Sequence, residues 1–477
     1  MTICIHPGYI TMTDISDSPP PTPTPSQQRF KNRSSPCEFA DAYYPGGLHP
    51  VELGDVFKNG QYKIIRKLGE GSFSTVWLAH DLKSVDPLSP ANHLLTSAMD
   101  RNPRYVALKI LVSDKAKQSQ ELQILHHLTQ VAPFESAQHI TQLLDEFEQK
   151  GPNGTHKCLV FEAMGPSFCQ MCLFPPGRHR MWGDKEQYPL RTAKHIFRDV
   201  LKGLSFLHKN GISHGDFQPG NVLFPLKNIN SYDEATLGHD EDNRMFQRVL
   251  VERKDGKKDK WAPQYLYAAE PLSNYTGLDG HWNVIDESLK VKLSDMGGAY
   301  FFNDPPKRPI VPIGLRAPEL ILKGELHKSQ DIWSFGCILF EMITGRRIFY
   351  IWGPPKHDTS LNDEHLLEIV EKLGPLPEEL FSHWKTSSLY YNEDGKIYNW
   401  IIDGVPEGQD PVTPDPSELE TMEAAFDKKC REMPEEEAQE VKKLIRWILQ
   451  YDPAKRPSAE EILRHPWFVE DAGEQVE

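Results

Sequence analysis

Short apolar runs separated by turn residues predict a β-rich region in the first part of the chain. Residues 62–68 and 75–79 have the composition and alternation of strands, and the glycine- and serine-rich stretch between them predicts a hairpin. Two further apolar runs, at 106–110 and 157–161, predict additional strands. The hydrophobic pattern therefore groups several strands ahead of residue 165.

Helical periodicity appears between these strands and dominates after them. Residues 121–128 and 190–210 carry apolar side chains at intervals of three and four, the spacing of one buried helix face. The apolar segment 331–336 is predicted to lie on a helix. Short strands at 222–224 and 291–294 are expected to pair, although a long segment separates them.

Two stretches interrupt this pattern. Residues 14–36 are rich in proline, serine and threonine and cannot bury enough apolar surface to offset the entropy of ordering. Disorder is therefore predicted for 1–42, with order beginning near Tyr43. Residues 226–286 form an insertion rich in charge and turn residues, and its basic run at 253–260 is interpreted as a solvated loop in preference to a localisation signal.

Composition argues against several functional classes. The 477 residues include 53 basic and 68 acidic side chains, and the formal charge of −15 disfavours nucleic-acid binding. No apolar run approaches the length of a membrane span, and residues 1–13 lack the pattern of a signal peptide. The seven cysteines are scattered and odd in number, as expected in a reducing compartment. We expect a monomer in the cytoplasm, the nucleus or both, without membrane contact.

Two features of the β-rich region indicate a phosphate-binding site. In the predicted hairpin, Gly69 and Gly71 would let backbone N–H groups approach phosphates closely, because no Cβ intervenes. Lys109 lies within the apolar strand at 106–110, where an ammonium group needs a counter-charge or an anionic ligand. Glu121 begins the next predicted helix and can supply that charge. This order of residues favours a functional pair over a purely structural one.

The segment from His214 to Asn221 carries the most specific chemical signal. Asp216 precedes Asn221 by five residues. At this spacing a carboxylate can accept the proton of an attacking hydroxyl while an amide oxygen holds a metal ion. Asp295 follows the strand at 291–294 and is expected to bind Mg²⁺ between nucleotide phosphates. Together these residues predict phosphoryl transfer.

Taken in order, these motifs resemble those of eukaryotic protein kinases from about residue 43 to residue 468. The His-Gly-Asp sequence alone also resembles small-molecule kinases such as aminoglycoside phosphotransferases, but 317–319 and the helical segment through His465 resemble the substrate lobe of protein kinases. The chain is most similar to the SR-protein kinases, in a fungal-type form, which phosphorylate Arg-Ser-rich splicing factors. The segments that carry this similarity are 43–50, 65–69, 73–78, 363–366, 373–377 and 465–468.

The resemblance implies an α+β fold with the two lobes of a protein kinase. A small β-rich N-lobe with one main helix would span 43–163, and a larger, mostly helical C-lobe would span 164–470. The C-lobe would contain the insertion and an activation segment at 295–319, and an acidic tail would follow at 471–477. ATP and Mg²⁺ would be the cofactors. The partner would be a protein substrate with serine or threonine acceptors, Arg/Ser-rich in the family resembled.

Matching residues take roles from this resemblance. Lys109 would hold the α- and β-phosphates while it pairs with Glu121. Asp216 would deprotonate the substrate hydroxyl, and Asn221 and Asp295 would bind Mg²⁺. The residues expected around the nucleotide are Leu68, Gly69, Glu70, Gly71, Ser72, Phe73, Val76, Ala107, Lys109, Glu162, Met164, Leu223 and Asp295.

Away from the reaction centre, the resemblance implies an ion pair and a docking surface. Glu319 is expected to form a structural ion pair with Arg456. Glu364 and Glu371 lie seven residues apart on one face of a predicted helix and match positions where SR-protein kinases bind basic peptides. Arg346 falls where that groove usually carries another acid. Arg-rich docking and a merely solvated helix face therefore both stay open.

The chain departs from the usual kinase pattern at three positions. Gly215 replaces the arginine that an activation-loop phosphate neutralises, and Tyr300 is the only hydroxyl residue from 295 to 319, which predicts activity without phosphorylation of this segment. Gln218, counted among the catalytic residues, replaces a lysine, and Pro312 replaces the threonine that contacts it. If Gln218 and Pro312 form a working variant of the site, we expect slow transfer. If their replacement of the usual residues has removed catalysis, the protein would be a pseudokinase that binds partners. The sequence Pro312-Ile313 also resembles the peptide-binding loop of tyrosine kinases, so tyrosine acceptors stay open.

Overall fold

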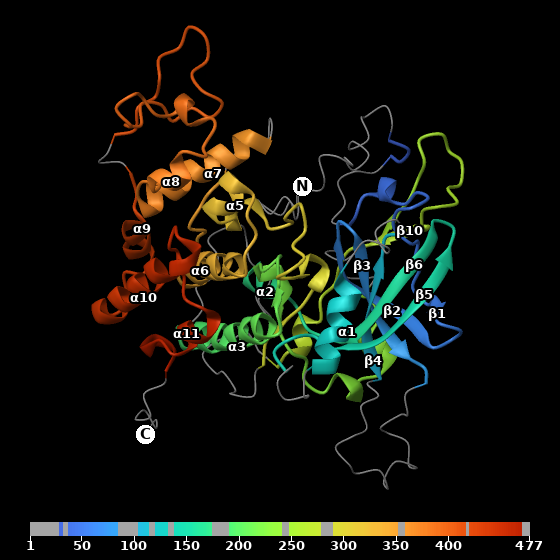
Figure 1. Ribbon diagram of the computed structural model, residues 1–477. Coiled ribbons are helices and arrows are strands. Elements are labelled where there is room, and N and C mark those ends of the chain that lie inside the picture. The colour runs from blue at the N-terminus through green and yellow to red at the C-terminus, as the bar shows by residue number, and fades with distance from the viewer. Residues whose placement is uncertain are drawn as a thin grey trace.

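A small β-rich lobe and a larger helical lobe make up the chain (Figure 1). The structure is a computed structural model and describes residues 28–31, 37–83, 104–113, 120–131, 138–173, 190–240, 248–277, 290–351, 358–415 and 419–469. The predictions for 1–27, 32–36 and 471–477 lie outside the described residues. The two-lobed α+β architecture that the resemblance implied is confirmed.

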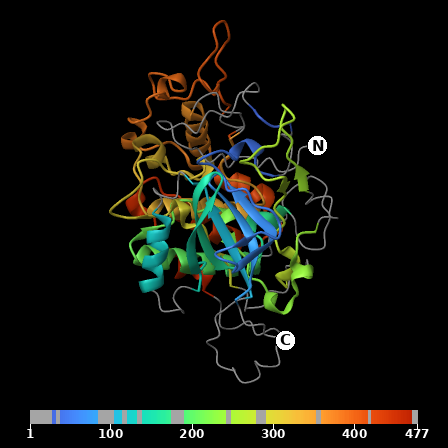
Figure 2. The same ribbon diagram turned by 90° about the vertical axis from the view of Figure 1, so that its right-hand side faces the viewer.

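A six-stranded antiparallel sheet forms the smaller lobe, in the order β1-β2-β3-β4-β6-β5. Its strands are β1 (Val56–Phe57), β2 (Tyr62–Gly71), β3 (Ser74–Asp81), β4 (Tyr105–Leu111), β5 (Leu143–Gly151) and β6 (Gly154–Glu162). Every residue of β4 is buried, because this strand lies inside the sheet with both faces covered. Helix α1 (Glu121–Val131) lies against the sheet (Figure 2), and its Ile124 shares an apolar cluster with Leu159 of β6.

The four strands predicted in this lobe are confirmed, with ends that differ by a few residues. Strand β5 was missed. It pairs with β6 at the edge of the sheet, and none of its residues is buried. An edge strand of this kind carries polar side chains on both faces, so its sequence lacks the apolar alternation that identifies a half-buried strand.

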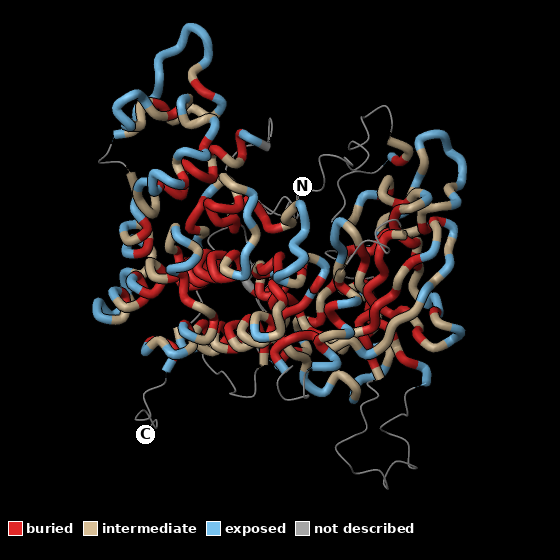
Figure 3. Tube along the Cα trace, in the orientation of Figure 1, coloured by how far each residue is buried: buried red, intermediate tan, exposed pale blue. Residues whose placement is uncertain are grey.

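The larger lobe is built around α6 (Ser329–Thr344), in which all residues after the first are buried (Figure 3). Apolar residues of α3 (Leu190–Lys209) and α10 (Glu435–Ile448) share one cluster with those of α6. The remaining helices of this lobe are α2 (Phe168–Leu173), α5 (Pro318–Lys323), α7 (Asp358–Leu373), α8 (Glu378–Phe381), α9 (Met422–Lys429) and α11 (Ala459–Leu463). Among the described residues, no helix combines the length and the apolar character needed to cross a membrane.

Two short strand pairs hold the loops that contain Asp216 and Asp295. Strand β7 (Ile212–Ser213) pairs with β12 (Tyr300–Phe301), and β8 (Val222–Leu223) pairs with β11 (Lys292–Leu293). The predicted pairing of 222–224 with 291–294 is therefore confirmed. The first pair precedes the segment that contains Asp216, and the second ends two residues before Asp295, so both loops are fixed at their bases.

The insertion and the N-terminal segment both pack on the smaller lobe. The insertion contributes α4 (Glu234–Leu237) and a hairpin of β9 (Arg248–Leu250) and β10 (Tyr265–Tyr267). Phe30 is 2% exposed and shares an apolar cluster with Leu266. The expectation of disorder up to residue 42 was therefore wrong for 28–31 and 37–42, because the aromatic ring of Phe30 finds an apolar surface that the insertion supplies.

Candidate active site

Lys109 joins two acidic residues from different parts of the chain. Its Nζ atom lies 2.6 Å from Oε1 of Glu121 in α1 and 2.8 Å from Oδ1 of Asp295. Burial would lower the pKa of the Lys109 ammonium, but the charges of Asp295 and Glu121 outweigh it and raise this pKa. The ammonium group is therefore fixed in its charged form beside the two carboxylates. The sequence predicted Glu121 as its partner but missed Asp295, which lies 186 residues away.

The loop that contains Asp216 is anchored to the central helix by Asp331 of α6. One Asp331 oxygen accepts from the His214 amide at 2.9 Å and the Ser213 hydroxyl at 2.8 Å, and the other accepts from the Gly215 amide at 3.0 Å. This carboxylate fixes the backbone just ahead of Asp216. The sequence gave no role to Asp331, although an acid within an otherwise apolar helix is a signal that could have indicated one.

The Asp216 carboxylate is bound by the two polar residues that follow it in the loop. Gln218 donates from Nε2 to both carboxylate oxygens, at 2.9 and 3.0 Å, and Asn221 donates from Nδ2 to the Asp216 carbonyl at 2.8 Å. Burial and the charge of Asp295 raise the pKa of Asp216 to about 8, against the hydrogen bonds from Gln218 and Asn221 and the charge of Lys109. Gln218 therefore contacts the predicted base directly, but it brings no positive charge.

The space beside the predicted base is filled by backbone of the activation segment. Gly215 has a φ of +69°, and a Cβ built on it would lie 2.1 Å from the Gly298 carbonyl oxygen. A Cβ on Gly298 would lie 2.8 Å from the Asp216 Cβ. Glycine at 215 thus permits both the left-handed backbone and this close approach. The segment after Asp295 packs where a side chain at 215 would otherwise lie.

The residues predicted around a nucleotide come from both lobes. Val76 of β3 lies opposite Lys109 of β4 in the sheet, and Ala107 lies opposite Leu78. Leu223 comes from β8 of the larger lobe. Residues 68–73 form the end of the hairpin between β2 and β3.

Glu162 is the last residue of β6, and Met164 follows it in the segment that connects the two lobes. The Glu162 carboxylate accepts from the Lys292 ammonium at 2.7 Å through both oxygens. The Glu162 side chain is therefore engaged by Lys292, so a contact with an adenine ring would have to use its backbone groups. Met164 is buried directly after this position.

Asn221 and Asp295 are chemically suited to a magnesium site. The Asn221 amide nitrogen donates to Asp216, so its oxygen is the atom that would coordinate a cation, and Asp295 supplies a carboxylate whose pKa is lowered by Lys109 despite its burial. Mg²⁺ commonly binds one or two protein carboxylates or amides together with substrate phosphates and waters. Among the described residues, no cluster of three or more His, Cys, Asp or Glu side chains forms a closed metal site. The donor set fits a metal that arrives with a nucleotide.

Glu319 and Arg456 form the buried ion pair that the sequence analysis expected. The guanidinium binds both carboxylate oxygens, at 2.6 and 2.7 Å, and stacks on the Trp333 ring at 4.8 Å from its centroid. Nearby, Arg316 donates to the Val311 carbonyl at 2.8 Å. These contacts fix the end of the activation segment on the larger lobe.

The acidic helix face expected to bind basic peptides is partly used within the chain. Glu371 accepts from the Glu420 amide at 3.0 Å and from Lys372 at 3.1 Å. Contacts within the chain therefore already use this carboxylate, which was one of the two acids considered for docking of basic peptides. Between Glu364 and Glu371, Glu368 accepts from the Tyr350 amide at 3.0 Å. Burial raises the pKa of Glu368 to about 7, with further contributions from Glu371 and Glu364. The sequence analysis did not identify Glu368.

Comparisons with known proteins agree with this geometry. The family model of the protein kinase domain matches residues 95–231 and 283–468, and the gap between the two matches falls within the expected insertion. The chain therefore belongs to the protein kinase family. A crystal structure of a kinase domain has 23% sequence identity and a TM-score of 0.54, over 88% of this chain and 98% of the other, and supports the fold alone.

Curated relatives narrow the class further. The serine/threonine-protein kinase SRPK of Physarum polycephalum is 30% identical over 91% of each chain. Protein kinase dsk1 of Schizosaccharomyces pombe is 27% identical over 91% of this chain and 85% of the relative, and human SRSF protein kinase 3 is 24% identical over 89% of each. The chain is an SRPK-like kinase, as its sequence indicated.

Proposed function

We propose that this protein transfers the γ-phosphate of ATP to serine or threonine residues of protein substrates. The observation that carries the proposal is the pair of contacts made by Lys109, at 2.6 Å to Glu121 and 2.8 Å to Asp295. A phosphate-binding lysine, the helix that orients it and a metal-binding carboxylate must all be in place for phosphoryl transfer. The contacts of Lys109 with Glu121 and Asp295 support this assignment of roles.

In the proposed reaction, Asp216 accepts the proton of the substrate hydroxyl. Gln218 holds both carboxylate oxygens, which orients the base toward the acceptor. Lys109 neutralises phosphate charge from β4. Mg²⁺ bound by Asn221 and Asp295 would neutralise charge on the phosphates during transfer. Because Gln218 carries no charge, we expect slower transfer than in kinases with lysine at this position.

We further propose that activity does not require phosphorylation of the activation segment. Tyr300 of this segment pairs with Ser213, and the Phe302 amide donates to the Gly211 carbonyl at 2.8 Å. The close approach of Gly298 to Gly215 adds a third fixed contact. These contacts hold the beginning of the segment without a phosphate, whereas new phosphate–arginine pairs order the segment in many kinases. Activity that disappears after phosphatase treatment would contradict this part of the proposal.

For the substrate, we propose basic, Arg/Ser-rich proteins as the first class to test. The formal charge of −15 favours a basic partner, and Glu364 contributes an acidic group on one face of α7, whereas Glu368 accepts from the Tyr350 amide and has a raised pKa. Glu371 supports this less, because the chain itself occupies it. We expect the protein to act as a monomer, in the cytoplasm, the nucleus or both.

The deciding experiment measures transfer from labelled ATP to Arg-Ser peptides, to a generic basic protein and to tyrosine-containing peptides. The full chain should label the Arg-Ser peptides, and Asp216→Asn should abolish the signal while Mg-ATP binding persists. Equal labelling of unrelated peptides would contradict the substrate class. Labelling confined to tyrosine would contradict the acceptor.

A second function is favoured by one observation. Gln218 directs its neutral amide nitrogen at both oxygens of Asp216, and it offers no positive charge to a transferring phosphoryl group. A pseudokinase that binds nucleotide and partner proteins would tolerate this. Tight Mg-ATP binding by the wild-type chain without transfer to any substrate would select this function over the first.

A further inference from the structure

A buried lysine in the smaller lobe is shared by two carboxylates. Lys67 lies in β2, two residues before Gly69, and its side chain has no exposed surface. Its Nζ atom donates to Glu38, to Glu70 and, at 2.8 Å, to the Tyr267 carbonyl oxygen. These partners belong to the N-terminal segment, the glycine-rich hairpin and the insertion. One ammonium group therefore joins three separate parts of the chain.

The N-terminal segment is held on the lobe by contacts of its own. Arg29 donates to the Tyr43 carbonyl at 2.6 Å and forms an ion pair with Asp259 of the insertion at 3.2 Å. The Tyr43 hydroxyl donates to Glu38, and Phe30 is buried. Glu38 is thus fixed from within its own segment, independently of the hairpin.

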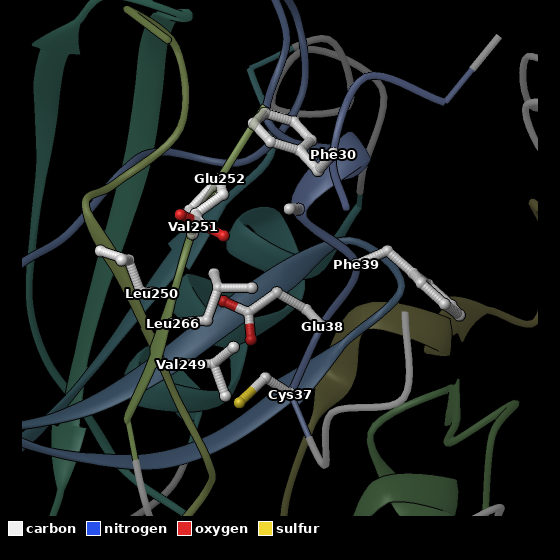
Figure 4. A pocket seen from close by; sticks show the side chains of 10 residues that line it. Phe30, Cys37, Glu38, Phe39, Val249, Leu250, Val251, Glu252 and Leu266 are labelled. Atoms are coloured by element: carbon white, nitrogen blue, oxygen red, sulfur yellow. The ribbon is translucent and has the colours of Figure 1, made fainter. Parts of the chain in front are cut away.

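The insertion completes the environment of Lys67. Glu52 accepts from the Tyr265 amide at 3.3 Å and from the Tyr267 hydroxyl at 3.2 Å, which ties β10 to the lobe. Figure 4 shows Glu38 beside Val249 and Leu266, at a pocket between the N-terminal segment and the insertion hairpin. The carboxylate of Glu38 is therefore largely shielded from water, where an ion pair is stronger than at an open surface.

The glycine-rich hairpin has a second, apolar attachment to the same segment. Phe73, at the tip of the hairpin, packs against the cluster that contains Phe30, Tyr43 and Leu266. A hairpin with two glycines has many accessible backbone conformations. Here it is restrained by Glu70 before the tip and by Phe73 after it.

We propose that residues 29–43 position the glycine-rich hairpin for nucleotide binding through Glu38, Lys67 and Glu70. The inference rests on the proposed function, in which this hairpin covers the phosphates of ATP. A hairpin restrained in the free protein loses less conformational entropy when it closes over a ligand, so the affinity for the ligand rises. The three are proposed as positioning residues, because their contacts are with other groups of the chain, and Glu70, which the sequence analysis expected around the nucleotide, is assigned its effect here through Lys67.

Each carboxylate can be neutralised without leaving the ammonium group unpaired. Glu38→Gln keeps the bond between Lys67 and Glu70, and Glu70→Gln keeps the bond between Lys67 and Glu38. Burial and the charge of Glu38 raise the pKa of Glu70 to about 7, against the effect of Lys67, so the cluster already carries an excess of negative charge. Both variants should therefore fold. Glu70 lies on the exposed hairpin, which makes Glu70→Gln the safer of the two.

The test uses the full chain with Glu38→Gln, Glu70→Gln and the double variant. Glu252→Gln is the matched control, because Glu252 pairs with Lys31 at 3.6 Å on the same face and is half-exposed. Hydrogen–deuterium exchange of residues 69–73 and the Kd of Mg-ATP, measured by calorimetry without protein substrate, are the readouts. Both single variants should show faster exchange in the hairpin and roughly three- to tenfold weaker binding. The fold-increase in the Mg-ATP Kd of the double variant should not exceed the product of the fold-increases of the two single variants. The control variant should have the Kd of wild type.

Unchanged hairpin exchange, or unchanged Mg-ATP affinity, in a folded Glu70→Gln variant would overturn the proposal. Faster exchange throughout the chain with Glu38→Gln would show a general loss of stability, and Glu70→Gln would then decide. Neither readout requires transfer, so a pseudokinase result leaves this test intact. If wild type did not bind Mg-ATP at all, the proposed function would fail, and the positioning role in nucleotide binding would fail with it.

Discussion

Replacing Gln218 by lysine is the change that most directly tests how this site works. Gln218 donates to both oxygens of Asp216, at 2.9 and 3.0 Å. A lysine ammonium at the same place would keep a donor near the carboxylate and add a positive charge. It would also present that charge to the phosphoryl group during transfer. Both effects should increase activity at neutral pH, but they depend differently on pH.

The magnitude follows from the pKa of Asp216. At a pKa of about 8, only about one-tenth of this carboxyl is ionised at pH 7. An opposite charge within a few ångströms lowers a carboxyl pKa by about 1–3 pH units. Because a general base must be ionised, the acidic limb of the activity profile should move to lower pH by that amount. At pH 7 the ionised fraction, and the rate with it, should rise by up to about tenfold.

The assay is a profile of kcat/KM for ATP between pH 5.5 and 9.5 at constant ionic strength, because kcat/KM reports groups of the free enzyme. Gln218→Lys should shift the acidic limb downward, and any further rise on the alkaline plateau would measure charge supplied to the transferring group. Gln218→Met removes both hydrogen bonds without adding charge and should shift the limb upward. Gln439→Lys makes the same charge change on an exposed face of α10 and serves as the control.

An acidic limb that stays in place or moves upward in Gln218→Lys would refute the claim that Asp216 titrates as the base. A large fall in plateau activity would refute the claim that the missing lysine limits the rate. In that case the glutamine would be an essential part of a rebuilt site.

Three other changes test the frame around the site. Glu319→Gln should cost about 3–5 kcal/mol in urea unfolding, because it leaves the Arg456 guanidinium buried without its carboxylate, and a loss below about 1 kcal/mol would contradict this. Gly215→Ala should lower kcat by about tenfold or more, because the added Cβ would displace the activation segment. Gly211→Ala is the control: its φ is similar, +74°, but a Cβ at 211 has no atom within 4 Å, so this change should affect stability only. The raised pKa of Glu368, about 7, makes stability fall as pH rises from about 4.5 to 7, since the native state holds a proton that the unfolded chain has lost. Glu368→Gln should remove about 1–2 kcal/mol of this dependence, and an unchanged pH profile of unfolding would count against the assignment.

The sequence determined most of the elements and was sufficient to propose the reacting groups. Apolar runs and helical spacing are local properties, so β4, α1 and α3 could be predicted within a few residues. Lys109 in an apolar strand required a counter-charge, and Glu121 opens the next predicted helix. Asp216 and Asn221 share one short loop, so their spacing alone was enough to predict a chemical role for each.

Only the tertiary structure decided which distant groups meet. Asp295 reaches Lys109 across 186 residues, and no local pattern records that contact. Lys67 lies in a strand that the sequence predicted, but no local pattern indicated that the N-terminal segment and the insertion bury its side chain completely. The burial of a polar side chain depends on what covers it, and the covering segments here come from far along the chain. The sequence pattern specifies what each segment can form, whereas packing between segments sets the charges, the contacts and the restraints of the site.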